Sequence, residues 1–138
     1  MNNHKILVVD DEPNVLKFIA DTLQTYDLIM ETSSFKAIEI MQIDRFDIFI
    51  VDYQMPQING IELLEEIKRI NLGRHYMSIF CTAYGTIHLF KTELVEGLYD
   101  FYVEKPINSD ILLQTVQRAV ISLERIRSIE KPAIKSLC

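Results

Sequence analysis

Residues 6–13 read ILVVDDEP, which is a run of four apolar residues followed by three acidic residues and a proline. The apolar run shows no alternation with polar residues, and this is typical of a strand that is covered on both faces in a parallel sheet. Pro13 suits the first turn of a helix, where its missing N–H costs nothing, and the acids suit the positive end of that helix. This segment predicts a strand, an acidic loop and a helix.

The same unit recurs along the 138 residues. Further short apolar runs predict strands at 28–30, 48–51, 77–81 and 101–103, of which the run at 28–30 is the weakest and is expected at an edge. Apolar stripes with helical spacing predict helices around 15–23, 37–41, 61–70, 89–95 and 111–123, with Ser33-Ser34 and Asn108-Ser109 as caps. Five strand–helix repeats predict an α/β fold of three layers: a doubly wound, five-stranded parallel sheet with helices on both faces.

Composition narrows the classes of function. The length fits one domain, and the net charge of −6 argues against nucleic-acid or anionic-membrane binding by this segment, since both need a basic surface. Cys81 lies in an apolar run and is expected to be buried, while Cys138 is the last residue. A disulfide is therefore not expected, and a cytoplasmic location fits. The first apolar run is too short for a signal peptide or a membrane span.

The carboxyl-terminal tail is a separate question. Residues 1–123 are expected to form the domain, and residues 124–138 a helical extension or linker that Pro132 ends. No recognisable output segment follows residue 123, so the chain is either a stand-alone protein or part of a longer one. The basic tail favours the longer protein.

In an open α/β sheet, ligands bind beyond the carboxyl ends of the strands. The polar residues that follow four of the apolar runs are Asp10, Asp11 and Glu12, then Asp52, then Thr82, and then Lys105. Two carboxylates about 4 Å apart repel by about 4 kcal/mol at an effective dielectric of 20, so one lysine cannot balance several acids. Oxygen ligands without histidine or cysteine favour a hard cation, Mg²⁺ or else Mn²⁺.

A carboxylate among these groups can also act as a nucleophile and form an aspartyl phosphate. Mg²⁺ and Lys105 would then hold the phosphoryl oxygens, and the hydroxyl of Thr82 would donate to one of them. Each group alone has an ordinary reading: the acids as a helix start, Thr82 as a turn hydroxyl, and Lys105-Pro106 as the approach to a helix. Their joint placement at successive strand ends is what indicates a site.

Four segments resemble the receiver domain of two-component response regulators: ILVVDDEP at 6–13, VDYQMPQINGIELL at 51–64, TA at 82–83 and KP at 105–106. The resemblance covers about residues 5–123. It implies a flavodoxin-like sheet with strand order 2-1-3-4-5. It also implies that Asp52 accepts a phosphoryl group from a histidine kinase or a phosphotransfer protein in a Mg²⁺-dependent reaction.

The resemblance implies a role for each matching residue. These are Asp11 as metal ligand with Asp10 beside it, Gln54 as a ligand through its backbone carbonyl, Thr82 as switch hydroxyl, Lys105 as phosphate contact and Tyr102 as aromatic switch. For Tyr102 the alternative is an ordinary half-buried aromatic residue. The Lys105-Pro106 bond is a candidate for the cis form. Phosphorylation would change the face made by the fourth helix, fifth strand and fifth helix, which would control an output domain or partner, or support a homodimer.

This sequence departs from the family pattern at residues 96–100, which are bulkier than usual and one residue longer before the lysine. Tyr84 is expected to screen attacking water from the site. A signalling switch of this kind modifies and demodifies only itself. One alternative is a Mg²⁺-dependent phosphohydrolase, although the acid expected two residues after its nucleophile is here Gln54. Another is an interaction module that no longer needs phosphorylation.

Overall fold

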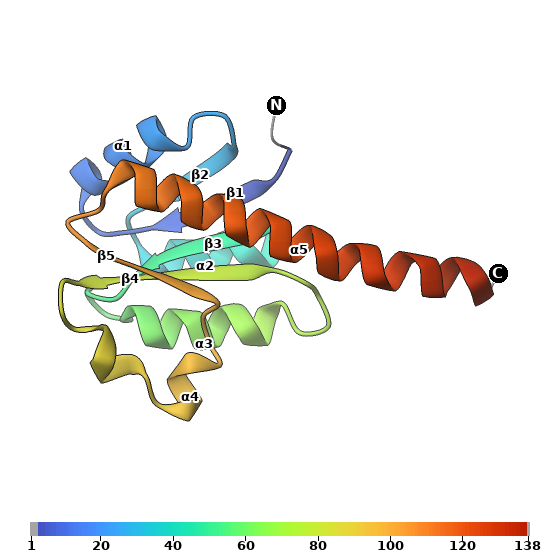
Figure 1. Ribbon diagram of the computed structural model, residues 1–138. Helices are drawn as coiled ribbons and strands as arrows, with labels where there is room; N and C mark the ends of the chain where they lie inside the picture. Colours follow the sequence, from blue (N-terminus) through green and yellow to red (C-terminus); the bar gives the residue numbers. More distant parts are fainter. Residues whose placement is uncertain (1–2, 138) are drawn as a thin grey trace.

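The computed structural model describes residues 3–137, so Cys138 lies outside the described residues. Its five strands are β1 (Lys5–Val9), β2 (Asp27–Glu31), β3 (Ile48–Asp52), β4 (Met77–Ala83) and β5 (Phe101–Lys105). All pair in parallel in the order β2-β1-β3-β4-β5 (Figure 1). The five predicted strands, their order and the edge position of β2 are confirmed.

Helices cover both faces of the sheet, as predicted. The four long helices are α1 (Pro13–Thr22), α2 (Ser34–Ile43), α3 (Gly60–Ile70) and α5 (Ser109–Leu137). Two short helical turns lie between β4 and β5. Successive strand residues point to opposite faces, so Ile6 and Val8 pack with α1 and α5, whereas Leu7 and Val9 pack with α2 and α3. Cys81 is 1% exposed in the first of these layers, as expected. Among the described residues, no helix combines the length and apolar character needed to cross a bilayer.

Caps fix where the helices start. The side chain of Ser33 accepts the N–H of Lys36 at 3.3 Å, and that of Asn108 accepts the N–H of Ile111 at 3.0 Å, which confirms both predicted caps. Asn59 and Glu62 form a reciprocal capping box at α3. Each cap satisfies amide groups that the first turn leaves without a partner. Because Asn59 and Asn108 follow β3 and β5, they hold α3 and α5 against the carboxyl edge of the sheet.

The prediction of one fourth helix over 89–95 is wrong. The chain instead makes a 3₁₀ turn, η1 (Ile87–Phe90), and a four-residue helix, α4 (Glu93–Glu96). Phe90 turns inward, with its ring centroid 4.7 Å from that of Tyr53 and 5.1 Å from that of Phe80, whereas Leu94 is 87% exposed. The apolar residues of 89–95 therefore do not share one buried face. Without the packing of such a face, a helix of one turn does not become longer.

The prediction that Pro132 ends the last helix is also wrong, because α5 continues through it to Leu137. Proline removes one backbone hydrogen bond, but its fixed φ near −65° is a helical value. The carboxyl-terminal end of α5 projects beyond the edge of the sheet (Figure 1).

Candidate functional site

Three charged side chains meet at the carboxyl edge of the sheet. Asp52 ends β3, Lys105 ends β5, and Asp10 follows β1. The Nζ atom of Lys105 lies 3.0 Å from Oδ1 of Asp52 and 2.9 Å from Oδ2 of Asp10. Asp52 and Asp10 are almost fully buried, at 4% and 2% exposed. The structure thus joins groups that lie up to 95 positions apart in the chain.

Burial and charge act against each other in this cluster. Burial, together with the negative charge of Asp10, raises the pKa of Asp52 to about 6 despite the contact with Lys105. Burial by itself would lower the pKa of Lys105, but the hydrogen bonds to Asp10 and Asp52 outweigh it and hold that pKa above its ordinary value. Lys105 is therefore a lasting positive charge, and it does not fully offset the two buried carboxyl groups.

A cluster of carboxylates lies beside this contact. Oxygen atoms of Asp10, Asp11 and Glu12 lie within 4.8 Å of one another. Asp11, Asp52, Gln54 and Lys105 line one cleft of about 650 Å³. The carboxylates and the backbone carbonyl of Gln54 offer oxygen atoms, and such a set fits a hard divalent cation, which would also relieve the excess of negative charge. The cluster Asp10–Glu12 could therefore bind a metal ion.

Thr82 lies at the same edge, in β4. Its side chain is 1% exposed, and its Oγ1 atom is buried without a hydrogen-bond partner. A buried hydroxyl without a partner costs about 1–3 kcal/mol, so few are kept in folded proteins without a reason. A hydroxyl in this state is available to donate to a group that enters the site.

The loop after Asp52 is fixed by a contact that sequence reasoning missed. A Cβ atom at Gly60 would lie 2.4 Å from the carbonyl oxygen of Asp52, so only glycine lets α3 start this close to the end of β3. The N–H of Gly60 also donates to the carbonyl of Tyr53 at 2.8 Å. Gln57 has φ of 69° in the same loop. In the sequence, Asn59 and Gly60 directly precede the predicted helix at 61–70, and this position alone does not reveal the contact.

The remaining predicted residues lie outside the charged contact. Tyr102 is 40% exposed, with the Nζ atom of Lys91 5.6 Å from its ring centroid. Tyr84 is 80% exposed and lines a neighbouring cleft with Phe18. The Lys105-Pro106 bond is cis, as predicted.

Comparison with known proteins agrees with this fold and site. The family model of the response regulator receiver domain matches residues 6–117, so the chain belongs to the family of response regulator receiver domains. The chain is similar to the transcriptional regulatory protein GlrR of Escherichia coli strain K12, with 27% identity over 117 residues that cover 83% of this chain and 26% of GlrR. The chain therefore spans about a quarter of the length of GlrR.

Two relatives match over almost their whole length. The chemotaxis protein CheY of Bacillus subtilis is 29% identical over 120 residues, which are 85% of this chain and 98% of CheY. The crystal structure of a response regulator receiver domain protein from Clostridium thermocellum superposes with a TM-score of 0.77 at 28% identity, covering 89% of this chain and 98% of that one. The size of the domain and the course of the chain are thus those of the family.

Family membership decides the class of function. Receiver domains of two-component systems accept a phosphoryl group, use Mg²⁺ in doing so, and interact with histidine kinases or phosphotransfer proteins. They are signalling switches and not enzymes that convert a metabolite. This favours the signalling reading over the phosphohydrolase.

Proposed function

We propose that Asp52 is the phosphoacceptor of this receiver domain. The observation that carries the proposal is the contact between the buried carboxylate of Asp52 and the ammonium of Lys105, 3.0 Å apart in an acidic cleft at the end of a central strand. A carboxylate oxygen of Asp52 would attack the phosphorus of a phosphohistidine donor. The new P–O bond forms as the P–N bond breaks, and the imidazole leaves with the electron pair and takes up a proton.

The carboxylates of Asp11 and Asp52 and the backbone carbonyl of Gln54 would hold Mg²⁺, with Asp10 beside them. When bound, the cation supplies positive charge to the phosphoryl oxygens. The ammonium of Lys105 supplies the second positive charge and orients the group from the other side. Asp10 keeps Lys105 in place through its 2.9 Å contact, and this contact can persist when Asp52 is modified.

The hydroxyl of Thr82 would donate to a phosphoryl oxygen and thereby gain the partner it lacks. Tyr102, at the surface of β5, would respond by changing its orientation, and the face of α4, β5 and α5 would then change its affinity for a partner. A homodimer through that face, an output domain, and a cytoplasmic location remain predictions. So does the role of Tyr84 in screening water.

The direct test is the intact mass of the protein after incubation with Mg²⁺ and acetyl phosphate. We expect the gain of one phosphoryl group in the wild type and in Glu65→Gln, and none in Asp52→Asn. We expect Asp11→Asn to lose most of the gain, since Asp11 is proposed as a metal ligand, whereas Glu65 is exposed on α3. A full gain in Asp52→Asn would refute the assignment of the acceptor.

A wild-type protein that gains no mass would need a second experiment. Binding of beryllofluoride in the presence of Mg²⁺ would show a working pocket that requires its own kinase. No binding would instead favour an interaction module that no longer needs phosphorylation.

A further inference from the structure

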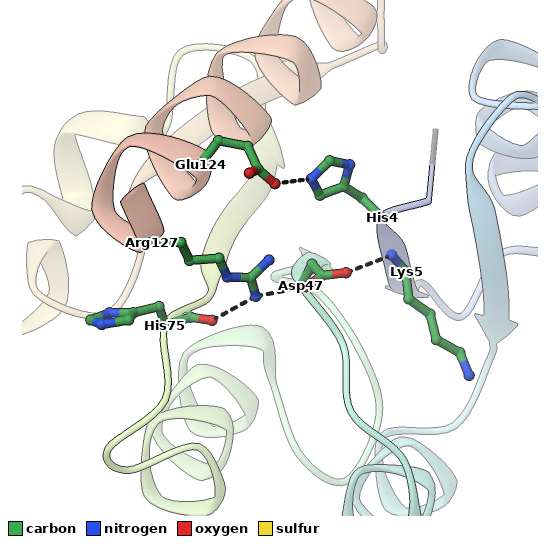
Figure 2. A network of polar contacts seen from close by, with 6 residues as sticks. All are labelled: His4, Lys5, Asp47, His75, Glu124 and Arg127. Atoms are coloured by element: carbon green, nitrogen blue, oxygen red, sulfur yellow. Dashed lines mark hydrogen bonds and ion pairs between the residues drawn. The ribbon is translucent and has the colours of Figure 1, made fainter. Parts of the chain in front are cut away.

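A second polar cluster lies at the opposite, amino-terminal edge of the sheet (Figure 2). Its centre is Asp47, the residue before β3, the strand that ends at Asp52. The backbone N–H of Asp47 donates to the carbonyl of Lys5 at 2.8 Å, and its carbonyl accepts the N–H of Met77 at 3.0 Å. Its carboxylate accepts the N–H of Lys5 at 2.8 Å. Asp47 thus ties together the starts of β1, β3 and β4.

The same carboxylate also binds the last helix. The other oxygen, Oδ1, accepts a hydrogen bond from Nη2 of Arg127 at 2.7 Å, and this nitrogen also lies 3.4 Å from the carbonyl oxygen of His75. The side chains of Arg127 and Asp47 are 35% and 23% exposed. Water therefore screens this pair less than it screens an ion pair on an open surface. The contact spans 80 positions of the chain.

Two histidine–glutamate contacts flank this pair. Nε2 of His4 lies 2.7 Å from Oε1 of Glu124, and Nε2 of His75 lies 2.7 Å from Oε1 of Glu130. Glu124, Arg127 and Glu130 are three residues apart and so lie on one side of α5. Ile126, within the same turns, packs against the core layer of α1 and α5. One side of the helix is therefore held by both polar and apolar contacts as far as residue 130.

We propose that residues 124–130 are latched to the amino-terminal edge of the sheet through the Arg127–Asp47 pair. The rigid body of the receiver then extends to Glu130, and not only to the predicted boundary at residue 123. The helix that projects from this edge is a lever whose direction is set by the sheet. The use of this lever in signalling rests on the proposed function. The latch itself does not depend on that function and is present in the unphosphorylated protein.

The position of the latch gives it a mechanical role. β3 carries the proposed phosphoacceptor at one end and Asp47 directly before the other. α5 starts at Ser109, close after Lys105, and crosses the sheet to the latch, so one helix contacts both edges. A shift of β3 or β5 would therefore be passed to the projecting helix as a change in its direction.

The test is hydrogen–deuterium exchange, followed by mass spectrometry, on the unphosphorylated full chain. We expect Arg127→Leu and Asp47→Asn each to speed exchange of the amides of residues 124–130 about fivefold, which corresponds to about 1 kcal/mol. The double variant should exchange no faster than the faster single variant, because the two residues share one interaction. Arg125→Leu is the matched control, since Arg125 lines a shallow groove with Ile121 and Ile129 on the exposed side of the same helix.

Two results would overturn the latch. One is unchanged exchange of residues 124–130 in Arg127→Leu, and the other is an equal increase in Arg125→Leu. Exchange of β1 and β3 reports whether Asp47→Asn still folds, and if it does not, Arg127→Leu and its control decide the question. The mass gain with acetyl phosphate should be retained in Arg127→Leu, so failure of the latch and failure of the proposed phosphoacceptor are separate outcomes.

Discussion

The two ends of β3 carry similar residues in opposite electrostatic situations. At the amino-terminal end, both carboxylate oxygens of Asp47 accept hydrogen bonds, and acidic and basic groups are paired. At the carboxyl-terminal end, Asp52 and Asp10 share the ammonium of Lys105, and the buried hydroxyl of Thr82 lacks a partner. The pKa of Asp52 is raised to about 6 by burial and by Asp10.

This difference separates the Asp47 carboxylate from the proposed site. A carboxylate whose two oxygens accept hydrogen bonds stabilises the fold and has little to gain from a ligand. The contrast concerns this carboxylate, because Nδ1 of His4 in the same cluster is buried without a hydrogen-bond partner. A buried cluster with more negative than positive charge destabilises the free protein. A cation or a hydrogen-bond acceptor that enters the cluster relieves part of this destabilisation. The comparison predicts that equivalent substitutions at the two ends of β3 have different, and in one case opposite, effects.

The largest effect is expected from Lys105→Met. Removal of the ammonium leaves Asp10 and Asp52 buried without their shared cation, and loss of one partner of a buried ion pair costs about 3 kcal/mol or more. Urea unfolding at pH about 8, with divalent cations chelated, should show this loss, while Arg127→Leu at the other edge should lose only about 1 kcal/mol. Equal losses would remove the contrast between the two clusters. The Lys105→Met variant should also fail to gain a phosphoryl group.

Asp52→Asn should stabilise the metal-free protein. The pKa of Asp52 is about 6 in the folded state against 3.8 for an unperturbed group, so the folded state binds more protons between these values. Stability from this group is full below pH about 4 and is lost as the pH rises through about 6. At pH about 8 the variant should be more stable than the wild type by up to about 3 kcal/mol.

Chemical unfolding of Asp52→Asn across this pH range would show the gain, and it should vanish below pH about 3, where the carboxyl group is protonated in both states. Asp47→Asn is the control at the other end of the same strand. It should be less stable than the wild type, because it weakens the hydrogen bonds that the carboxylate accepts. A gain in both variants would mean that the two ends of β3 do not differ.

The smallest effect is expected from His75→Gln. The contacting side chains of His75 and Glu130 are 38% and 56% exposed, and such pairs contribute about 0.5 kcal/mol. Urea unfolding should show this loss beside the loss of about 1 kcal/mol expected for Arg127→Leu. A loss in His75→Gln as large as that in Arg127→Leu would contradict the minor role of this contact.

The site could be predicted largely from sequence because of how parallel sheets are connected. Right-handed crossovers place the carboxyl ends of all strands at one edge, so the residues after each apolar run must meet. Asp10, Asp52, Thr82 and Lys105 were found in this way. Their placement at one edge depends on parallel strands, which the repeated strand–helix unit predicts, and on the strand order, which the family resemblance implies.

The local sequence pattern gave a wrong prediction where tertiary packing determines the structure. Phe90 and Leu94 are four residues apart, the spacing of a buried helical stripe, yet only Phe90 packs inward, against Tyr53 and Phe80, while Leu94 is exposed. The close approach at Gly60 and the missing partner of Thr82 were equally out of reach, since each depends on atoms that other segments bring near.

The sequence by itself determined the strands of the sheet, the edge that carries the proposed site and the residues placed there, because periodicity and strand-end position are local properties of the chain. Only the tertiary structure decided the cluster at the other edge. No sequence motif marks the residues of this cluster, which are His4, Asp47, His75 and Arg127. The hydrogen bonds that join them to α5 connect residues from 52 to 120 positions apart. Such contacts exist because a straight helix, rising about 1.5 Å per residue, crosses the whole sheet and reaches the strand starts on the far side.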